Sequence, residues 1–311
     1  MNKTFSAPKK ILIPTDFSET ANIALPYAAA LARENGAAVE LIHVTEDPVL
    51  WMDYANSQES VLKNIRKKRE ELALDKLKKL QHEFFEGCDL AINALWSVES
   101  AATAIVDHAR TDNFDLIVIA THGHGFPKRA IVGSVAERIM RRSSCATLIV
   151  PARRPHEHLP NKPKHLPCKK IAVATDFSLA SHAAIGYAKP YQLINKASLS
   201  LVHVLSDLSS PDMGIDGNTS IHGFLELQAT YRQYIYDQLI ALRRELGVEA
   251  AECVVLDRAY SVANTLGDFT KENNIDLLIV ASQSGGRHPY SIGGVAEGVV
   301  RKVDCPVLMV P

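Results

Sequence analysis

The chain has 311 residues, 34 basic and 35 acidic side chains, a formal net charge of −1 and a hydrophobic content of 47%. This balance is that of an ordinary soluble protein. It lacks the excess of basic residues that is typical of nucleic-acid-binding proteins, so that class is excluded. Its longest apolar runs span about five to seven residues, far fewer than the roughly 20 that cross a bilayer, so a membrane partner is excluded as well. The length favours two domains.

The predicted elements of the first half alternate between strands and helices. Strands are expected near residues 9–14, 38–44, 90–95, 115–120 and 146–150, and helices near 19–34, 59–86, 100–111 and 133–142. Residues 116–120 form an uninterrupted apolar run, which is typical of a strand buried on both faces of a parallel sheet. Pro26 falls inside the first helix and predicts a bend there, because an interior proline removes a hydrogen bond.

The second half repeats the first. Residues 10–18, KILIPTDFS, match residues 170–178, KIAVATDFS, so Asp16 and Asp176 lie 160 residues apart. Gly133 and Gly293 have the same separation. Strands of the second copy are expected near 169–174, 198–204, 250–256, 276–281 and 306–310. Agreement at separated points indicates a tandem duplication, with domains at 1–152 and 168–311 and a proline-containing linker at 153–167.

The repeated pattern predicts an α/β fold. Strands that alternate with helices favour a five-stranded, parallel, doubly wound sheet in each copy, with right-handed crossovers. Ligands of such sheets bind outside the carboxyl ends of the strands, where the strand order reverses. Asp16, Val44 and the segment from Ala120 to Ser134 all follow predicted strands, so we expect them to converge at one site.

The segment from Ala120 to Ser134 has the features of a phosphate-binding loop. It is rich in glycine, and a helix start at Gly133 and Ser134 presents free backbone N–H groups and the positive end of a helix dipole. It fits neither the P-loop pattern nor the dinucleotide GxGxxG pattern, because Lys128 stands where the last glycine of the latter is needed.

This segment resembles the G-x2-G-x9-G-[ST] loop of the universal stress protein family, with Ala120 in place of the first glycine. The resemblance covers both copies and implies an adenine nucleotide alpha hydrolase-like fold that binds ATP with Mg²⁺ in the N-terminal domain. By analogy with the family, the residues that line the base and ribose are Pro14, Thr15, Asp16 and Val44. Those that hold the phosphates are Ala120, His122, Gly123, Gly133, Ser134 and Val135.

The second copy departs from this pattern. Ser284 replaces the second glycine, the interval to Gly293 is one residue shorter, and Gly294 replaces Ser134. The second domain is therefore expected to bind nucleotide weakly or not at all. In the family the last strands mediate dimerisation, so residues 146–150 and 306–310 are expected to pair the two copies as an intramolecular pseudo-dimer. Whether two such chains form a homodimer stays open.

Several side chains have a structural as well as a functional interpretation. Asp16 is either a ligand of the nucleotide or a helix cap, for which Ser18 is an equal candidate. His43 and His203 are expected to be structural. The candidates for which both interpretations stay open are His122 and His124 as acid or base, Lys128 and Arg129 as phosphate contacts, His156, His158, His165 and Cys168 as a zinc site in the linker, and Cys145 with Cys305 as a redox pair.

The resemblance implies a stress-response regulator. Nucleotide binding is expected to order residues 121–132 and so to change a surface that a protein partner recognises. An odd number of cysteines and an amino terminus without an apolar signal segment favour the cytoplasm. No residue is an evident general base, so any hydrolysis of ATP is expected to be slow. The alternatives are an interaction scaffold that binds no nucleotide and an ATPase or nucleotidyl transferase.

Overall fold

The computed structural model describes residues 7–46, 59–121, 132–152, 163, 165–166, 168–205, 221–258, 260–282 and 293–311. In the first half the strands are β1 (Lys10–Pro14), β2 (Ala38–Glu46), β3 (Leu90–Ser97), β4 (Leu116–Ala120) and β5 (Ala146–Val150). The helices are α1 (Glu19–Asn22), α2 (Leu25–Asn35), α3 (Glu59–Phe84), α4 (Ala101–Thr111) and α5 (Ser134–Arg142).

The second half repeats this order. Its strands are β6 (Lys170–Ala174), β7 (Ser198–Val204), β8 (Glu252–Leu256), β9 (Leu277–Ala281) and β10 (Val307–Val310). Its helices are α6 (Leu179–Asn195), α7 (Ile221–Glu245), α8 (Val262–Glu272) and α9 (Gly294–Lys302). The strands expected from the sequence are therefore confirmed in both copies. Among the described helices, none is long and apolar enough to cross a membrane.

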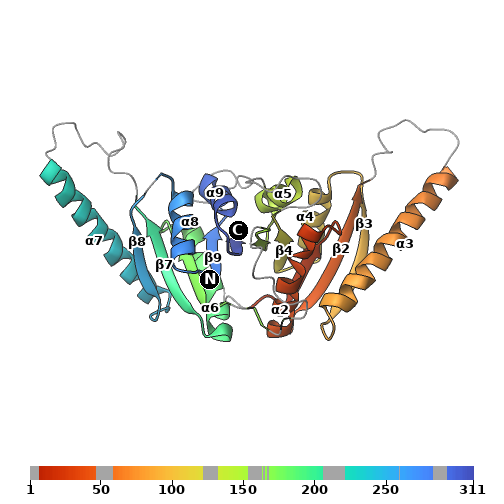
Figure 1. The fold of residues 1–311 in the computed structure, drawn as a ribbon, viewed down its shortest axis with the longest axis horizontal. Helices are drawn as coiled ribbons and strands as arrows, with labels where there is room; N and C mark the ends of the chain where they lie inside the picture. Colours follow the sequence, from red (N-terminus) through yellow and green to blue (C-terminus); the bar gives the residue numbers. More distant parts are fainter. Residues whose placement is uncertain are drawn as a thin grey trace.

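All these strands belong to one 10-stranded sheet in the order β3-β2-β1-β4-β5-β10-β9-β6-β7-β8. Within each half the neighbouring strands run parallel. In the first half the strand order reverses at β1, which has β2 on one side and β4 on the other. The halves meet at β5 and β10, which are antiparallel with Leu308 opposite Leu148. This pairing confirms the predicted intramolecular pseudo-dimer, and it makes the molecule elongated, with α3 and α7 at its two ends (Figure 1).

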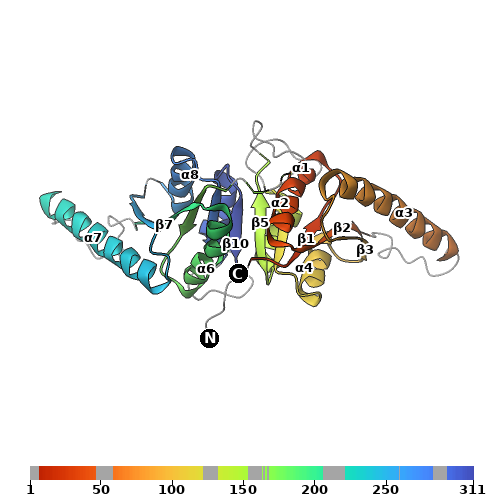
Figure 2. The ribbon, with the colours of Figure 1, turned by 90° about the horizontal axis from the view of Figure 1, so that it is seen from below.

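The sheet is buried on both faces, because alternate residues of each strand enter different cores. Ile11 and Ile13 belong to the core that also contains residues of α2, α3, α6 and α7, whereas Leu12 between them belongs to the core that contains residues of α4, α5, α8 and α9. Each core contains residues from both halves, so the apolar packing is continuous across the junction of β5 and β10. Figure 2 shows α2 and α6 together on the face that is turned toward the viewer.

The first helix differs from its prediction. It is interrupted after Asn22, and α2 begins with Pro26 in its first turn. A proline is tolerated in a first turn because the N–H that it lacks would have no partner inside the helix there. The expected bend is therefore a break between two helices. In the second half, α6 is continuous and carries Pro190 inside it.

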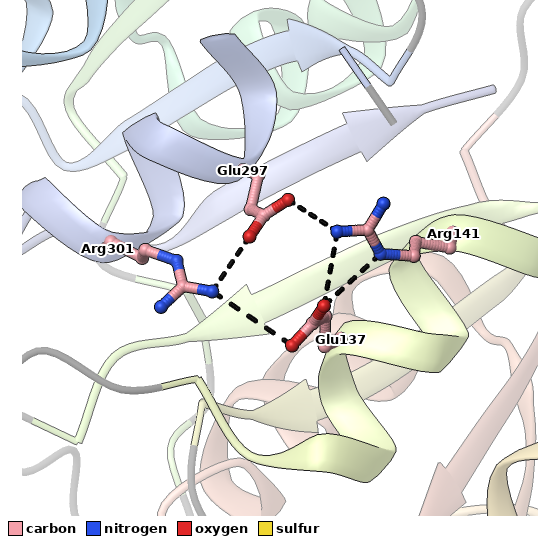
Figure 3. Close-up of polar contacts among 4 residues, drawn as sticks. All are labelled: Glu137, Arg141, Glu297 and Arg301. Atoms are coloured by element: carbon pink, nitrogen blue, oxygen red, sulfur yellow. Dashed lines mark hydrogen bonds and ion pairs between the residues drawn. The ribbon is translucent and has the colours of Figure 1, made fainter. Parts of the chain in front are cut away.

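Four charged side chains join the halves where α5 and α9 lie side by side (Figure 3). Arg141 pairs with Glu297 across the junction at 2.7 Å and with Glu137 of its own helix at 3.1 Å. Arg301 pairs with Glu297 at 2.7 Å and with Glu137 at 4.0 Å, which closes the ring. Glu297 and Arg301 are the repeats of Glu137 and Arg141, so each half contributes the same pair. We call these four residues the ion ring.

The described part of the predicted linker is attached to the first domain. Leu166 is buried, with 5% of its surface exposed, and its backbone N–H donates to a carboxylate oxygen of Glu34 at 2.5 Å. Arg33 donates to the carbonyl of Pro163 at 2.9 Å. This end of the segment is therefore packed and not simply solvated. Two of the candidate zinc ligands, His156 and His158, lie outside the described residues. Among the residues that the structure describes, no group of three potential metal ligands occurs.

The cysteines of the chain are all free. Cys305 is buried and Cys145 is half-buried. Cys145 contacts the hydroxyl of Ser143, and burial raises the pKa of its thiol. Cys145 and Cys305 lie just before β5 and β10 and form no disulfide with each other.

Candidate functional site

A cavity of about 210 Å³ opens at the carboxyl ends of β1, β2 and β4. The predicted convergence of these strand ends is therefore observed. The candidate residues in its walls are Pro14, Thr15, Asp16, Val44, Ala120, Gly133, Ser134 and Val135. The other two, His122 and Gly123, lie outside the described residues, as do His124, Lys128 and Arg129. We call this cavity the N-terminal cleft.

The turn after β1 places Asp16 at the rim of the cleft. Phe17 has a left-handed backbone with φ of 65°, which is uncommon for a residue other than glycine and reverses the chain directly after the strand. Asp16 accepts hydrogen bonds from the backbone N–H of Ser18 at 2.9 Å and from its hydroxyl at 2.5 Å. Ser18 in turn caps α1 by accepting from the N–H of Ala21. The helix cap is therefore Ser18, and Asp16 is held in place beside it.

His43 supports this turn from β2. Its Nδ1 lies 2.8 Å from the carbonyl oxygen of Thr15, and since a carbonyl only accepts, Nδ1 carries the proton. Its ring stacks on Phe17 with 4.4 Å between centroids. Burial lowers the pKa of His43 below its ordinary value, against the raising effects of Thr15 and Asp16, so the imidazole is neutral near pH 7. His203 makes the same bond to Thr175 at 2.8 Å, which confirms the predicted structural role.

The opposite wall of the cleft is the start of α5. The helix begins after Gly133, which provides no side chain to cap it. Gly133 itself donates its backbone N–H to the carbonyl of Thr121 at 2.7 Å, and this bond holds the helix start next to the end of β4. By contrast, a serine hydroxyl caps each of the helices α1, α4, α6 and α8: Ser18, Ser100, Ser178 and Ser261. The first turn of α5 thus presents its N–H groups without a side-chain acceptor.

The floor of the cleft is apolar, and part of it was missed by the sequence analysis. The lining residues not predicted as ligands of the nucleotide are Ala21, His43, Ala101, Ile105, Ile119, Thr121 and Ala136. Ala101 and Ile105 come from α4, which packs on the same face of the sheet as α5. Their spacing of one helical turn was a usable signal, because it places both on the stripe of α4 that faces the sheet.

The second half presents a different cavity at the corresponding end of the sheet. It has a volume of about 780 Å³, lies between α8 and α9, and includes Arg258, Arg301, Lys302 and Asp176 in its walls. Among its described lining residues the N-terminal cleft has no lysine or arginine. The counterpart of Val44, Val204, does not line this second cavity. We call it the C-terminal groove.

Comparison with known proteins identifies the family to which this architecture belongs. The model of the universal stress protein family matches residues 8–151 and, a second time, residues 167–311. The chain belongs to the universal stress protein family. Each match spans one half of the 10-stranded sheet, so this universal stress protein contains two copies of the family's domain in tandem.

Its relatives match either one half of the chain or both halves. Universal stress protein MJ0531 of Methanocaldococcus jannaschii is 34% identical over 143 residues, which are 46% of this chain and 81% of the relative. A universal stress protein from Archaeoglobus fulgidus has the same fold across both halves, with a TM-score of 0.64, 19% identity, and coverage of 98% of this chain and 97% of that chain. A third, solved in complex with cAMP, is 21% identical, with a TM-score of 0.33 and coverage of 47% of this chain and 98% of that chain.

Proposed function

We propose that this universal stress protein binds an adenine nucleotide, ATP with Mg²⁺, in the N-terminal cleft and acts as a nucleotide-dependent regulator of a stress response. One observation carries the proposal. The cleft joins an apolar floor to the uncapped start of a helix, and these two surfaces match the two parts of a nucleotide, a flat apolar base and a polyanionic tail.

The apolar floor suits the base. Ile105 and Ile119 are nearly fully buried, so they offer a rigid surface without polar groups that would compete with the ligand. The volume of about 210 Å³ is below the roughly 300–1,000 Å³ of complete ligand pockets, so we assign only the base and ribose to it. Asp16 lies at the rim, where its carboxylate can accept hydrogen bonds from ribose hydroxyls.

The start of α5 suits the phosphates. Its free N–H groups and the positive end of its dipole attract negative charge, and the hydroxyl of Ser134 adds a neutral donor. The residues present also fit Mg²⁺, because the hydroxyl of Ser134 and the carboxylate of Asp16 are the hard oxygen ligands that this ion prefers. When bound, Mg²⁺ would neutralise part of the phosphate charge.

The described lining favours binding over hydrolysis. Its titratable side chains are Asp16 and His43. His43 uses its only proton to hold the carbonyl of Thr15, and its neutral ring is part of the turn. Neither residue has the arrangement of a general base held beside a water molecule, so we expect slow turnover at most. A protein that keeps its nucleotide is suited to regulation, since occupancy biases the conformation that a partner protein recognises.

The test is a calorimetric titration of MgATP into the wild-type chain and two matched variants, Gly133→Trp and Gly293→Trp. Gly133 has a φ of −60° and Gly293 has the same value, so both backbones accept a side chain. We expect one site per chain in the wild type, affinity lowered at least about tenfold by Gly133→Trp, and little change with Gly293→Trp. Melting curves check that both variants fold.

Two outcomes would contradict the proposal. If the wild type binds no MgATP at millimolar concentration, the chain is a scaffold. If Gly293→Trp causes the larger loss, the nucleotide binds in the other half. A single-turnover assay with labelled ATP then separates a regulator, which returns intact nucleotide, from a slow ATPase.

A further inference from the structure

The C-terminal groove lies between α8 and α9, which approach each other closely at a glycine. A Cβ atom added at Gly298 would lie 2.9 Å from the Cβ of Ala263, a distance that real Cβ atoms do not show. The counterpart of Gly298 in the first half is Arg138, whose side chain the second half lacks. Gly298 lines the groove of about 780 Å³, so this difference between the halves falls in its wall.

The walls of the groove carry an excess of positive charge. Three cationic residues, Arg258, Arg301 and Lys302, line it together with a single carboxylate, Asp176. Arg258 and Lys302 are exposed and make no ion pair with any residue that the structure describes. Arg301 is already paired with Glu297 in the ion ring. Two cations are therefore available to an incoming anion, and a third lies beside them.

The polar groups of the groove favour an anion as well. Asn264 provides an amide, and Gly294 and Val295, in the first turn of α9, which has no side-chain cap, also line the groove. Burial raises the pKa of Asp176, but hydrogen bonds from the Ser178 hydroxyl and backbone outweigh this and keep it low, so its carboxylate stays charged. The single carboxylate of Asp176 stands against Arg258 and Lys302, the two cations that have no ion pair among the described residues, so the walls remain net cationic.

A nucleobase has no place in this groove. The apolar floor of the N-terminal cleft is formed in part by Val44 and Ile119, whereas their counterparts Val204 and Val280 are buried and do not line the groove. The apolar residues that do line it, such as Val262 and Val295, lie in the first turns of α8 and α9. The groove therefore offers charge and hydrogen-bond donors without a slot for a ring.

We propose that the C-terminal groove is a second anion site, separate from the N-terminal cleft, that takes a polyphosphate chain without a nucleobase. Arg258, before the start of α8, contributes a planar fork with five donors, and Lys302, at the end of α9, contributes a point charge, so a chain of phosphates that follows the groove can meet both cations. The two halves of the duplication then have different ligand classes, although their sheets are equivalent.

The test uses tripolyphosphate as the probe, titrated calorimetrically at low ionic strength into the full chain. Three chains are compared: the wild type, the double variant Arg258→Glu with Lys302→Glu, and Arg142→Glu. Arg142 is the matched control, because it is the counterpart of Lys302 in the first half and bears the same charge at the end of α5. The substituted side chains are not part of either core, so the variants are expected to fold.

The proposal predicts binding to the wild type, a loss of affinity of about tenfold or more in the double variant, and no more than about a twofold change with Arg142→Glu. Adenosine, which has no phosphate, should not compete. The proposal is overturned if the wild type does not bind tripolyphosphate, if the double variant binds it equally well, or if Arg142→Glu weakens binding as much as the double variant does, since the probe would then sense only net charge.

Discussion

The N-terminal cleft and the C-terminal groove occupy equivalent ends of two copies of one sheet, yet they offer different chemistry. Both halves keep the Thr-Asp-Phe-Ser turn with a left-handed phenylalanine, Phe17 and Phe177, and both fasten it with a histidine from the next strand. The difference comes from the helices on one face. In the first half α4 and α5 close an apolar cleft, and in the second half α8 and α9 leave a cationic groove.

This comparison shows how a duplicated domain diverges while its framework stays fixed. The strands contribute residues to two continuous cores. Substitutions at the first residues of a helix therefore leave the packing of the sheet unaltered. Under our two proposals, the ligand class depends on a few side chains at the helix starts and in the groove walls, where the halves differ, as at Ser134 against Gly294 and Arg138 against Gly298. Fold and function are separable in this molecule because they depend on different residues.

The largest effect is expected from the two equivalent aspartates. Asp16→Ala should weaken MgATP binding by about tenfold to a hundredfold, the loss of a charged hydrogen-bonding partner worth about 1.5–3 kcal/mol. Asp176→Ala removes the same carboxylate from the second half and should leave MgATP affinity unchanged. Calorimetry of both variants measures the contrast, and equal effects at the two positions would show that the halves bind the nucleotide alike.

The ion ring should contribute to the stability of the junction between the halves. Arg141→Ala leaves Arg301 as the only cation of the ring beside Glu137 and Glu297, and we expect it to lower the free energy of unfolding by about 1 kcal/mol, the upper end for partly exposed pairs. Arg110→Ala is the matched control, because Arg110 pairs with Asp107 at 2.8 Å within one half and is 69% exposed. Denaturant unfolding compares the two, and a larger loss from Arg110→Ala would contradict a role for the ring.

A smaller effect is expected from exchanging the residues that begin α5 and α9. Ser134→Gly removes one neutral hydrogen-bond donor and should weaken MgATP binding by a few-fold, or about 1 kcal/mol. Gly294→Ser has room for its side chain, since nothing lies within 4 Å of a Cβ at that position. It should not create a nucleotide site, because the groove has no apolar floor. A second MgATP site in the Gly294→Ser chain would show that the hydroxyl alone separates the halves.

The smallest effect is expected from pH, and it should be shared by both halves. Burial lowers the pKa of His43 and of His203 below the ordinary value of 6.5, so at acidic pH the unfolded chain binds protons that the folded chain does not. Stability contributed by the neutral rings is present above about pH 6.5 and declines as pH falls below it. Melting temperatures of His43→Gln and His203→Gln should each depend less on pH in this range than the wild type does, and by similar amounts.

Much of this fold could be predicted from the sequence, because apolar strand runs and the repeat of KILIPTDFS are local signals. The convergence of residues at the ends of β1, β2 and β4 followed from the topology of parallel sheets, and their assignment as nucleotide ligands came from the resemblance to the family. The break before Pro26 was predicted only as a bend, since the sequence does not say whether a proline lies inside a helix or in its first turn.

The rest depended on distances between elements. Glu137 and Arg141 are spaced as a pair within one helix, and their partners across the ion ring follow only from the antiparallel contact of β5 and β10. The groove was not predicted at all, because its lining residues come from segments that are far apart in the chain, such as Ala263 of α8 and Gly298 of α9. Arg258 and Lys302 lie 44 residues apart in the chain and have no motif in common.

The central claim is that the two halves differ in the ligand that they accept. A crystal structure of the full chain grown with saturating MgATP tests it most directly. We predict one nucleotide per chain, with its base on the floor formed by Ile105 and Ile119 and its phosphates at the start of α5. A nucleotide bound between α8 and α9, or one in each half, would contradict the account.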